Sequence, residues 1–334
     1  MISLNNYICF SMEAPLKRII PSIYTSDGQF SQAENRQYIL DYNEAMARAL
    51  LLQEQGADEI IIMDVTTIAE KRRNLNRFLK DLSRNLQIPF TFGGGVHSIQ
   101  DVTDILKQGV RKVYVNSAAV RDPSLINKIT SEFGKDSLMV AIDTKQTFGK
   151  WKVFLNGGKS RTEIDLLNWI EISQLRGASE ILVSTIARNS TEPEDIMDII
   201  SKVKSVCKVP LLVSVGARTD EDFIQTFKYT DADGIVSGHF FLSPEHTIVG
   251  LKHHLREAGI AVSETGSLTE SPKEEILIDR HEDEEHVIET SESVLIEQKK
   301  SPASILGNML SGFIRRKDKP SSDAVPPPED EEII

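Results

Sequence analysis

Glycine and serine residues gather at three places that directly follow β-rich runs of the sequence. They are Gly93 to Gly95, Ser214 to Gly216, and the pair Ser237 and Gly238. Small residues at the end of a strand expose backbone N–H groups and let a phosphate approach the chain. Clusters in both halves of the chain predict two phosphate sites, and thus a small-molecule substrate with a phosphate at each end. Alternatively, these glycines only make tight turns.

Larger polar side chains stand at the ends of other β-rich runs. They are Tyr24, Asp64, Asn116, Asp143 and Thr185. In a barrel of alternating strands and helices, the carboxyl ends of the strands carry the chemistry. These residues are therefore the first candidates for a catalytic site.

The elements that position these residues alternate along the chain. β-rich runs cover residues 18–24, 59–65, 88–92, 112–116, 138–143, 180–185, 209–215 and 234–238. Amphipathic stretches such as residues 99–108 and 124–133 lie between them. Near-continuous apolar strands separated by helices predict a parallel sheet covered on both faces. Eight such units predict a (βα)8 barrel, the α/β class known as a TIM barrel, better than an open sheet.

An internal repeat divides this barrel into two halves. The tetrapeptide G-A-D-E at residues 56–59 recurs as G-A-S-E at residues 177–180, and Gly95 recurs as Gly216 at the same spacing. A constant spacing across several strand–helix units predicts two half-barrel repeats with one plan. The first strands of the halves then correspond, which places Tyr24 opposite Asp143.

Charge and cysteine content exclude several classes of protein. The formal net charge is −12. Residues 261–334 hold 18 acidic and 8 basic side chains, a net of −10, which leaves −2 for residues 1–260. A near-neutral core lacks the basic face that nucleic-acid binding requires. Two distant cysteines, Cys9 and Cys207, predict no disulfide framework and no metal site. Neither a signal peptide nor a membrane span is predicted, so we expect a cytoplasmic protein.

The composition predicts three segments. Residues 1–15 are an N-terminal extension, residues 16–262 form the barrel, and residues 263–334 form an acidic tail. The tail is rich in Glu, Ser, Lys and Pro, a composition that predicts disorder. Within it, the apolar residues of segment 303–316 follow helical spacing. This short amphipathic helix either binds an unknown partner or membrane surface, or forms only transiently.

Several segments resemble the cyclase subunit of imidazole glycerol phosphate synthase. The similar segments are KRIIPSIYTSDG at residues 17–28, FGGGVHSIQD, KVYVNSAAV, MVAIDTK and GASEIL. The similarity covers residues 16 to 262. It implies an ammonia-dependent lyase or synthase of histidine biosynthesis without a cofactor or a metal. A glutaminase subunit bound at the N-terminal face of the barrel would supply the ammonia, which attacks a bis-phosphorylated ribulosyl carboxamide nucleotide.

The resemblance also assigns roles to residues. Asp143 matches one of two aspartates that act as general acid and base, and Asp64 matches the acidic residue that ends the second strand. The positions matching the phosphate and substrate sites are Gly95, Asn116, Ser117, Asn189, Ser190, Ser214, Gly216, Ser237 and Gly238. A ring of charges at the amino ends of strands matches the ammonia gate: Arg18, Glu59, Lys112 and Glu180. Without the resemblance, the same ring is a structural plug of mutually satisfied charges.

Other positions depart from the family pattern. Tyr24 stands where the first-strand aspartate belongs, and a phenol with a reference pKa of about 10 is a poor base near neutral pH. Gln32 replaces a lysine of a mobile loop. Residues 187–191 read ARNST instead of DRDGT, which removes two carboxylates and a glycine. Arg111 lies where the surface facing the glutaminase is often acidic.

Three hypotheses follow from this combination. The chain is a cyclase of this family with weak or altered activity, or a divergent relative that delivers ammonia to another acceptor, such as a surface-polysaccharide sugar. The third hypothesis is a non-catalytic scaffold that binds a phosphorylated ligand.

Overall fold

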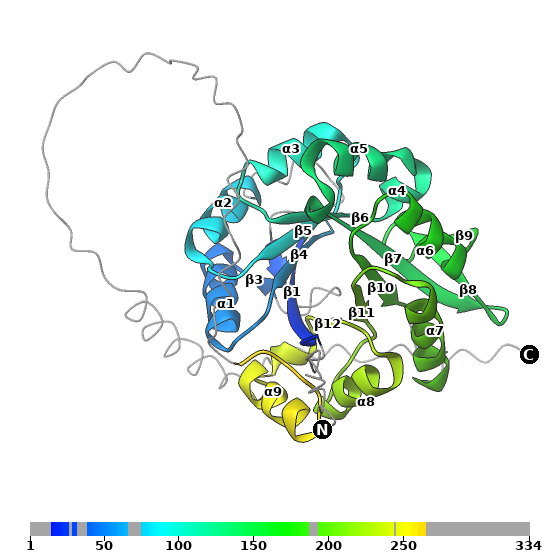
Figure 1. Ribbon diagram of the computed structural model, residues 1–334. Coiled ribbons are helices and arrows are strands. Elements are labelled where there is room, and N and C mark those ends of the chain that lie inside the picture. Colours follow the sequence, from blue (N-terminus) through cyan, green and yellow to red (C-terminus); the bar gives the residue numbers. More distant parts are fainter. Residues whose placement is uncertain are drawn as a thin grey trace, which may run out of the picture. The chain divides into compact units, whose positions relative to one another are not determined.

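The computed structural model describes residues 15–26, 29–31, 39–65, 75–186, 193–243 and 245–264. Eight parallel strands of this part form a closed barrel, and helices surround it (Figure 1). The barrel strands are β1 (Arg18–Ser26), β4 (Ile60–Asp64), β5 (Phe90–Gly93), β6 (Lys112–Val115), β7 (Leu138–Thr147), β10 (Ile181–Thr185), β11 (Leu211–Ser214) and β12 (Gly234–Ser237). Pairing of β7 with β10 closes the ring. The predicted TIM barrel is confirmed.

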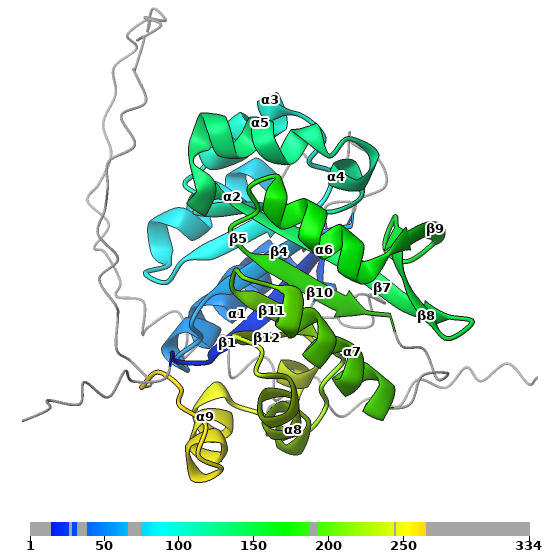
Figure 2. The ribbon, with the colours of Figure 1, turned by 45° about the vertical axis from the view of Figure 1, so that its right-hand side comes forward.

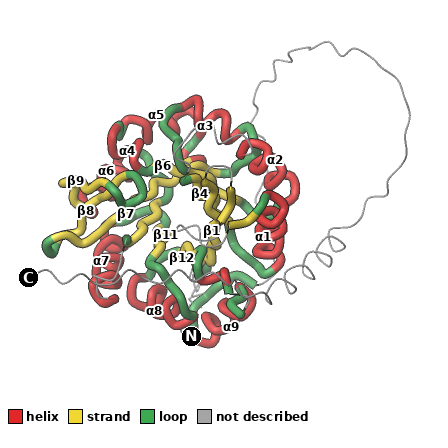
Figure 3. Tube along the Cα trace, turned by 180° about the vertical axis from the view of Figure 1, so that it is seen from behind, coloured by secondary structure: helices red, strands yellow, loops and turns green. Residues whose placement is uncertain are grey.

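Helices cover the outside of the barrel, as the view from behind shows (Figure 3). The α-helices are α1 (Tyr42–Glu54), α2 (Leu75–Asn85), α3 (Ile99–Leu106), α4 (Ser117–Arg121), α5 (Ser124–Phe133), α6 (Leu166–Leu175), α7 (Pro193–Val206), α8 (Asp220–Thr230) and α9 (Ile248–Glu257). Short 3-10 turns are η2 (Lys135–Ser137) and η3 (Phe240–Leu242). Among the described residues, none of these helices could cross a membrane.

Each half-barrel extends its first strand into an antiparallel hairpin. β2 (Gln29–Ser31) pairs with β1, and β3 (Ile39–Leu40) pairs with β2. In the second half, β8 (Lys150–Leu155) pairs with β7, and β9 (Ser160–Asp165) pairs with β8. Figure 2 shows β8 and β9 reaching beyond the ring of helices.

The two halves repeat each other in side-chain detail. The bounds of β10 and β11 lie 121 residues after those of β4 and β5, since Ile181 follows Ile60 and Leu211 follows Phe90 by that distance. Helices α3 and α8 both begin with a capping box, Ser98 with Asp101 and Thr219 with Asp222. Such boxes satisfy the first amides of a helix and fix where it starts. The predicted half-barrel repeat is therefore confirmed.

Two apolar cores stabilise the barrel. The larger one fills the space between the sheet and the helices. The smaller one, which we call the interior layer, lies inside the ring of strands and consists of Ile20, Ile61, Tyr114, Met139, Ala141, Leu182, Leu212 and Val236. Alternate residues of a strand face opposite sides, so these positions fix which residues of each strand point into the barrel.

The C-terminal end of the described chain is tied to the first strands. Lys17 bridges to Val262. The fully buried Lys252 ammonium donates to the Gly56 carbonyl at 2.7 Å, to Asp58 at 2.8 Å and to the Ser263 hydroxyl at 2.6 Å. A buried cation requires such partners. Residues up to Ser263 thus belong to the barrel's own hydrogen-bond network.

Candidate functional site

Asp143 and Asn116 lie together at the carboxyl ends of the barrel strands. Asp143 belongs to β7 and Asn116 directly follows β6, and both continue the inward-facing positions of the interior layer. The Asn116 Nδ2 donates to the Asp143 carboxylate at 3.0 Å. Asn116 Oδ1 is buried and has no partner among the described residues. The amide fixes how the carboxylate is presented to the barrel mouth.

Strand register shows that Tyr24 is the equivalent of Asp143. Tyr24 pairs with Met63 on β4, and Asp143 pairs with Ser184 on β10. Met63 and Ser184 are themselves separated by the repeat spacing of 121. The two-fold axis of the barrel therefore relates the phenol of one half to the carboxylate of the other.

The first glycine cluster follows β5. Gly94 and Gly95 have positive φ values of 109° and 64°, which favour glycine. A Cβ at Gly94 would collide with the backbone of Asp64, the buried last residue of β4. This close approach requires a glycine. Ser117 is the first residue of α4, and its hydroxyl accepts a hydrogen bond from the backbone N–H of Asn156 at 2.8 Å.

The second cluster combines the ends of β11 and β12. Ser214 ends β11, and Gly216 follows with a φ of 74°. A Cβ built on Gly216 would meet no atom of the described residues within 4 Å. Ser237 ends β12 and is buried, and its hydroxyl accepts from the Phe240 amide at 3.4 Å. Gly238 follows it directly.

The four predicted gate residues form one ion-pair network, which we call the floor ring, at the amino ends of the strands. Arg18 contacts Glu59 at 3.4 Å and pairs more closely with Glu180. Lys112 contacts Glu180 at 2.5 Å. The carboxylates are buried, whereas the Arg18 and Lys112 side chains keep 29% and 16% of their surface exposed. The ring closes the barrel on the side opposite Asp143.

Electrostatics distinguish the two carboxylates of the floor ring. Burial raises the pKa of Glu59, and the nearby Glu180 adds to this, although Lys112 and Arg18 oppose it. Burial would also raise the pKa of Glu180, but its direct bonds to Lys112 and Arg18 outweigh burial and lower it. Glu180 therefore holds its negative charge more firmly than Glu59 does.

Two members of this region, Thr91 and Gly234, are not among the residues predicted from the sequence. The buried Thr91 hydroxyl on β5 hydrogen-bonds to Glu59. Gly234 lies beside Arg18 across the strands, where a Cβ would stand 3.1 Å from the Arg18 Cβ and 2.8 Å from Leu212. Side chains alternate between the two faces of a strand, and Thr91 lies two residues before Gly93 on β5. This spacing was a sequence signal that could have placed Thr91 inside the barrel.

Some predicted residues lie outside the described ranges. These are Gln32, Asn189, Ser190 and the tail segment 303–316. Arg111 is exposed at the amino end of β6. No cluster of potential metal ligands occurs within the ranges that the structure covers. Cys207 is a buried free thiol.

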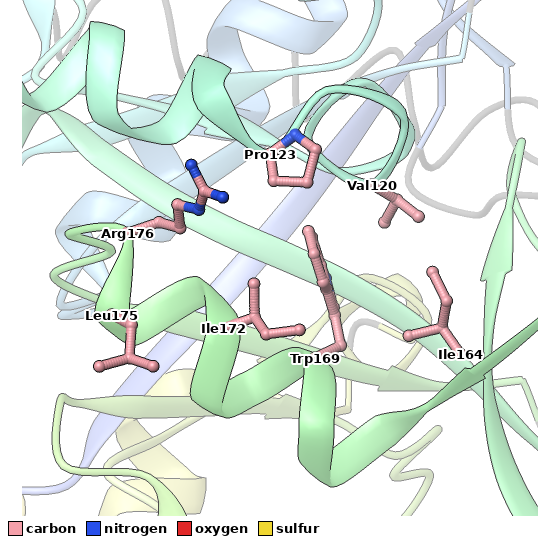
Figure 4. A pocket seen from close by; sticks show the side chains of 7 residues that line it. All are labelled: Val120, Pro123, Ile164, Trp169, Ile172, Leu175 and Arg176. Atoms are coloured by element: carbon pink, nitrogen blue, oxygen red, sulfur yellow. The ribbon is translucent and has the colours of Figure 1, made fainter.

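An apolar groove lies on the outer wall (Figure 4). Its lining comes from the α4–α5 region, β9 and α6: Val120, Pro123, Ile164, Trp169, Ile172, Leu175 and Arg176. None of the predicted site residues lines it. The groove is therefore distinct from the barrel mouth.

Fold and site together define a (βα)8-barrel protein with an acidic site at the strand carboxyl ends and a charged ring at the opposite end. The histidine biosynthesis protein family matches residues 18–247, and the chain belongs to this family. It is 36% identical over 246 residues to imidazole glycerol phosphate synthase subunit HisF of Flavobacterium psychrophilum, covering 74% of this chain and 98% of that protein. The same subunit of Natranaerobius thermophilus is 35% identical over 246 residues, with the same coverage. The resemblance found in the sequence is thereby confirmed.

Proposed function

We propose that the chain is an ammonia-dependent cyclase of the imidazole glycerol phosphate synthase type. The observation that carries this proposal is Asp143, held by Asn116 inside the barrel mouth. A positioned carboxylate can take a proton from the attacking nitrogen and return one during ring closure. Its location at the carboxyl ends of barrel strands is where substrates of this fold bind.

The two glycine clusters support a substrate with two phosphates. Gly94 and Gly95 lie in one half of the barrel, and Gly216 lies at the equivalent place in the other. No described residue would contact a Cβ at Gly216, which supports the approach of a phosphate to backbone amides there. Asp64, Ser117, Ser214, Ser237 and Gly238 are proposed to complete the two sites, together with Asn189 and Ser190.

The floor ring supports delivery of ammonia from a glutaminase subunit at the amino ends of the strands. Arg18, Glu59, Lys112 and Glu180 join strands from both halves and leave the two cations partly exposed on that face. If the ion pairs of the floor ring separated, the barrel would open at the amino ends of its strands. We propose that this glutaminase shares a cytoplasmic location with the chain.

Tyr24 favours a second candidate function. Because it replaces the equivalent carboxylate, the site holds one of the two groups expected for acid–base cyclisation. A changed acid–base pair suits an altered acceptor for ammonia. A divergent relative that amidinates another substrate, such as a polysaccharide sugar, is therefore the alternative.

The proposal is tested by incubating the purified chain with the bis-phosphorylated ribulosyl carboxamide nucleotide and an ammonium salt. Turnover of the nucleotide is followed by its ultraviolet absorbance. Ammonium bypasses the glutaminase, so docking does not influence the result. Turnover by the purified chain is expected, and Tyr24→Asp combined with Gln32→Lys should increase it. A folded chain that binds the nucleotide without turnover, even with both substitutions, would refute the cyclase function and leave two hypotheses, a relative with another ammonia acceptor and a non-catalytic scaffold.

A further inference from the structure

One barrel strand connects the floor ring to the candidate site. Lys112 begins β6, Tyr114 follows two residues later, and Asn116 follows two residues after that. Side chains at this spacing face the same side of a strand. Lys112 belongs to the floor ring, Tyr114 to the interior layer and Asn116 to the Asp143 site. Anything that passes from the floor to the site must pass the layer that holds Tyr114.

The interior layer is closely packed. Ile20, Ile61, Met139 and Leu212 have no exposed surface, whereas Tyr114 is 9% exposed, the largest value in the layer. Close packing of this kind leaves no continuous opening for a molecule to cross. Passage therefore requires a side chain of the layer to move.

Tyr114 occupies the place that β5 leaves empty. Gly93 pairs with Tyr114 across the two strands, and a Cβ on Gly93 would overlap the tyrosine ring. The ring thus lies over the Gly93 backbone. In the second half-barrel, Gly234 pairs with Leu212 as Lys112 pairs with Thr91 in the first. Val236 and Tyr114 each lie two residues further along their strands, so Val236 is the equivalent of Tyr114 on the opposite wall. Tyr114 makes the interior layer asymmetric and fills the β5–β6 side.

We propose that the Tyr114 ring is a gate inside the barrel that limits passage of ammonia from the floor ring to Asp143. The inference rests on the proposed cyclase function. Ammonia is small and neutral, so rotation of one ring away from Gly93 opens a path beside β6. Tyr114 acts as a positioning residue that neither binds substrate nor transfers a proton.

The test uses the full chain in complex with the proposed glutaminase subunit. Two quantities are measured: cyclised product formed per glutamate released, and the rate of turnover with ammonium salt. Ammonium reaches the mouth directly, so only the first quantity depends on the gate. The variants are Tyr114→Trp, Tyr114→Ala and Tyr114→Phe, with Val236→Ala as the matched change on the opposite wall.

Wild type is expected to form less than one product per glutamate. Tyr114→Trp should lower this ratio about threefold or more, which a modest rise in a barrier produces. Tyr114→Ala should raise the ratio toward one, while Tyr114→Phe and Val236→Ala leave it unchanged. Ammonium-driven rates should stay within about twofold in every variant.

Two failures are distinguishable. Ammonium-driven turnover with the same product-to-glutamate ratio in wild type and in each folded Tyr114 variant would overturn the gate alone. Should Tyr114→Trp fail to fold, Tyr114→Ala decides the question by itself. Absence of ammonium-driven turnover would overturn the cyclase function, and the gate with it.

Discussion

Replacement of Glu180 by glutamine tests the floor ring quantitatively. Glu180 pairs with both Arg18 and Lys112, and glutamine keeps its size but removes its charge. The two cations then share Glu59, which is 3.4 Å from Arg18. Removal of one partner from a buried pair costs about 3–5 kcal/mol. Because Arg18 and Lys112 retain some contact with water, we expect about 2–3 kcal/mol for Glu180→Gln.

Glu59→Gln is the matched control on the other carboxylate. The raised pKa of Glu59 means that its ionised form costs free energy in the fold. The contribution of the Glu59 carboxyl to stability is complete below its pKa in the unfolded chain, near 4.5. This contribution decreases as the pH rises through the raised pKa of Glu59 in the folded chain. A neutral glutamine should therefore cost about 1 kcal/mol or less near pH 7, since it can still bond to Thr91.

The pH dependence has the opposite sign for Glu180. The pKa of Glu180 is lowered, so its contribution to stability is present above its pKa in the unfolded chain, near 4.5. This contribution is lost as the pH falls through the pKa of Glu180 in the folded chain. Urea unfolding, followed by tryptophan fluorescence, should show a lower midpoint for Glu180→Gln than for Glu59→Gln near neutral pH. The difference should shrink as the pH falls below 4.5 and through the lowered pKa of Glu180. Equal midpoints at neutral pH, or a difference that persists unchanged in acid, would refute this assignment of the charges.

Three further predictions concern the interior layer, the site and the tail. Gly93→Ala should destabilise the barrel by about 1–3 kcal/mol, because its Cβ overlaps Tyr114. Urea midpoints measure this, and an equal cost of Gly93→Ala in a Tyr114→Ala background would contradict it. Asn116→Ala should lower kcat of ammonium-driven turnover about tenfold, since it releases the Asp143 carboxylate. An unchanged kcat would count against this role. A chain ending at Glu264 retains the bond of Lys252 to Ser263 and should unfold at the full-length temperature in calorimetry; a fall of more than about 4 °C would extend the barrel beyond our boundary.

The sequence predicted the barrel because apolar periodicity and the internal repeat act at every strand. The repeat spacing placed β10 and β11 correctly, and it identified Tyr24 and Asp143 as equivalent. Their pairing partners in the structure agree with this. These features depend on local sequence and could be inferred without coordinates.

Other features depend on contacts between distant strands and could not be inferred in the same way. Gly93 appeared as a member of a phosphate cluster, but its lack of a side chain also accommodates Tyr114. Gly234 ends up beside Arg18 only after β12 pairs with β1. The bond between Asn116 and Asp143 likewise joins two strands. A single sequence does not reveal which small residue makes room for which large one.

The measurement that tests the central claim most directly compares Asp143→Asn with Tyr24→Phe in ammonium-driven turnover. The two positions are equivalent in the two half-barrels, so each substitution serves as the control for the other. If Asp143 carries the proton transfer, Asp143→Asn should lower kcat about 10²–10⁴-fold, whereas Tyr24→Phe should change it little. A fully active Asp143→Asn variant would contradict the account.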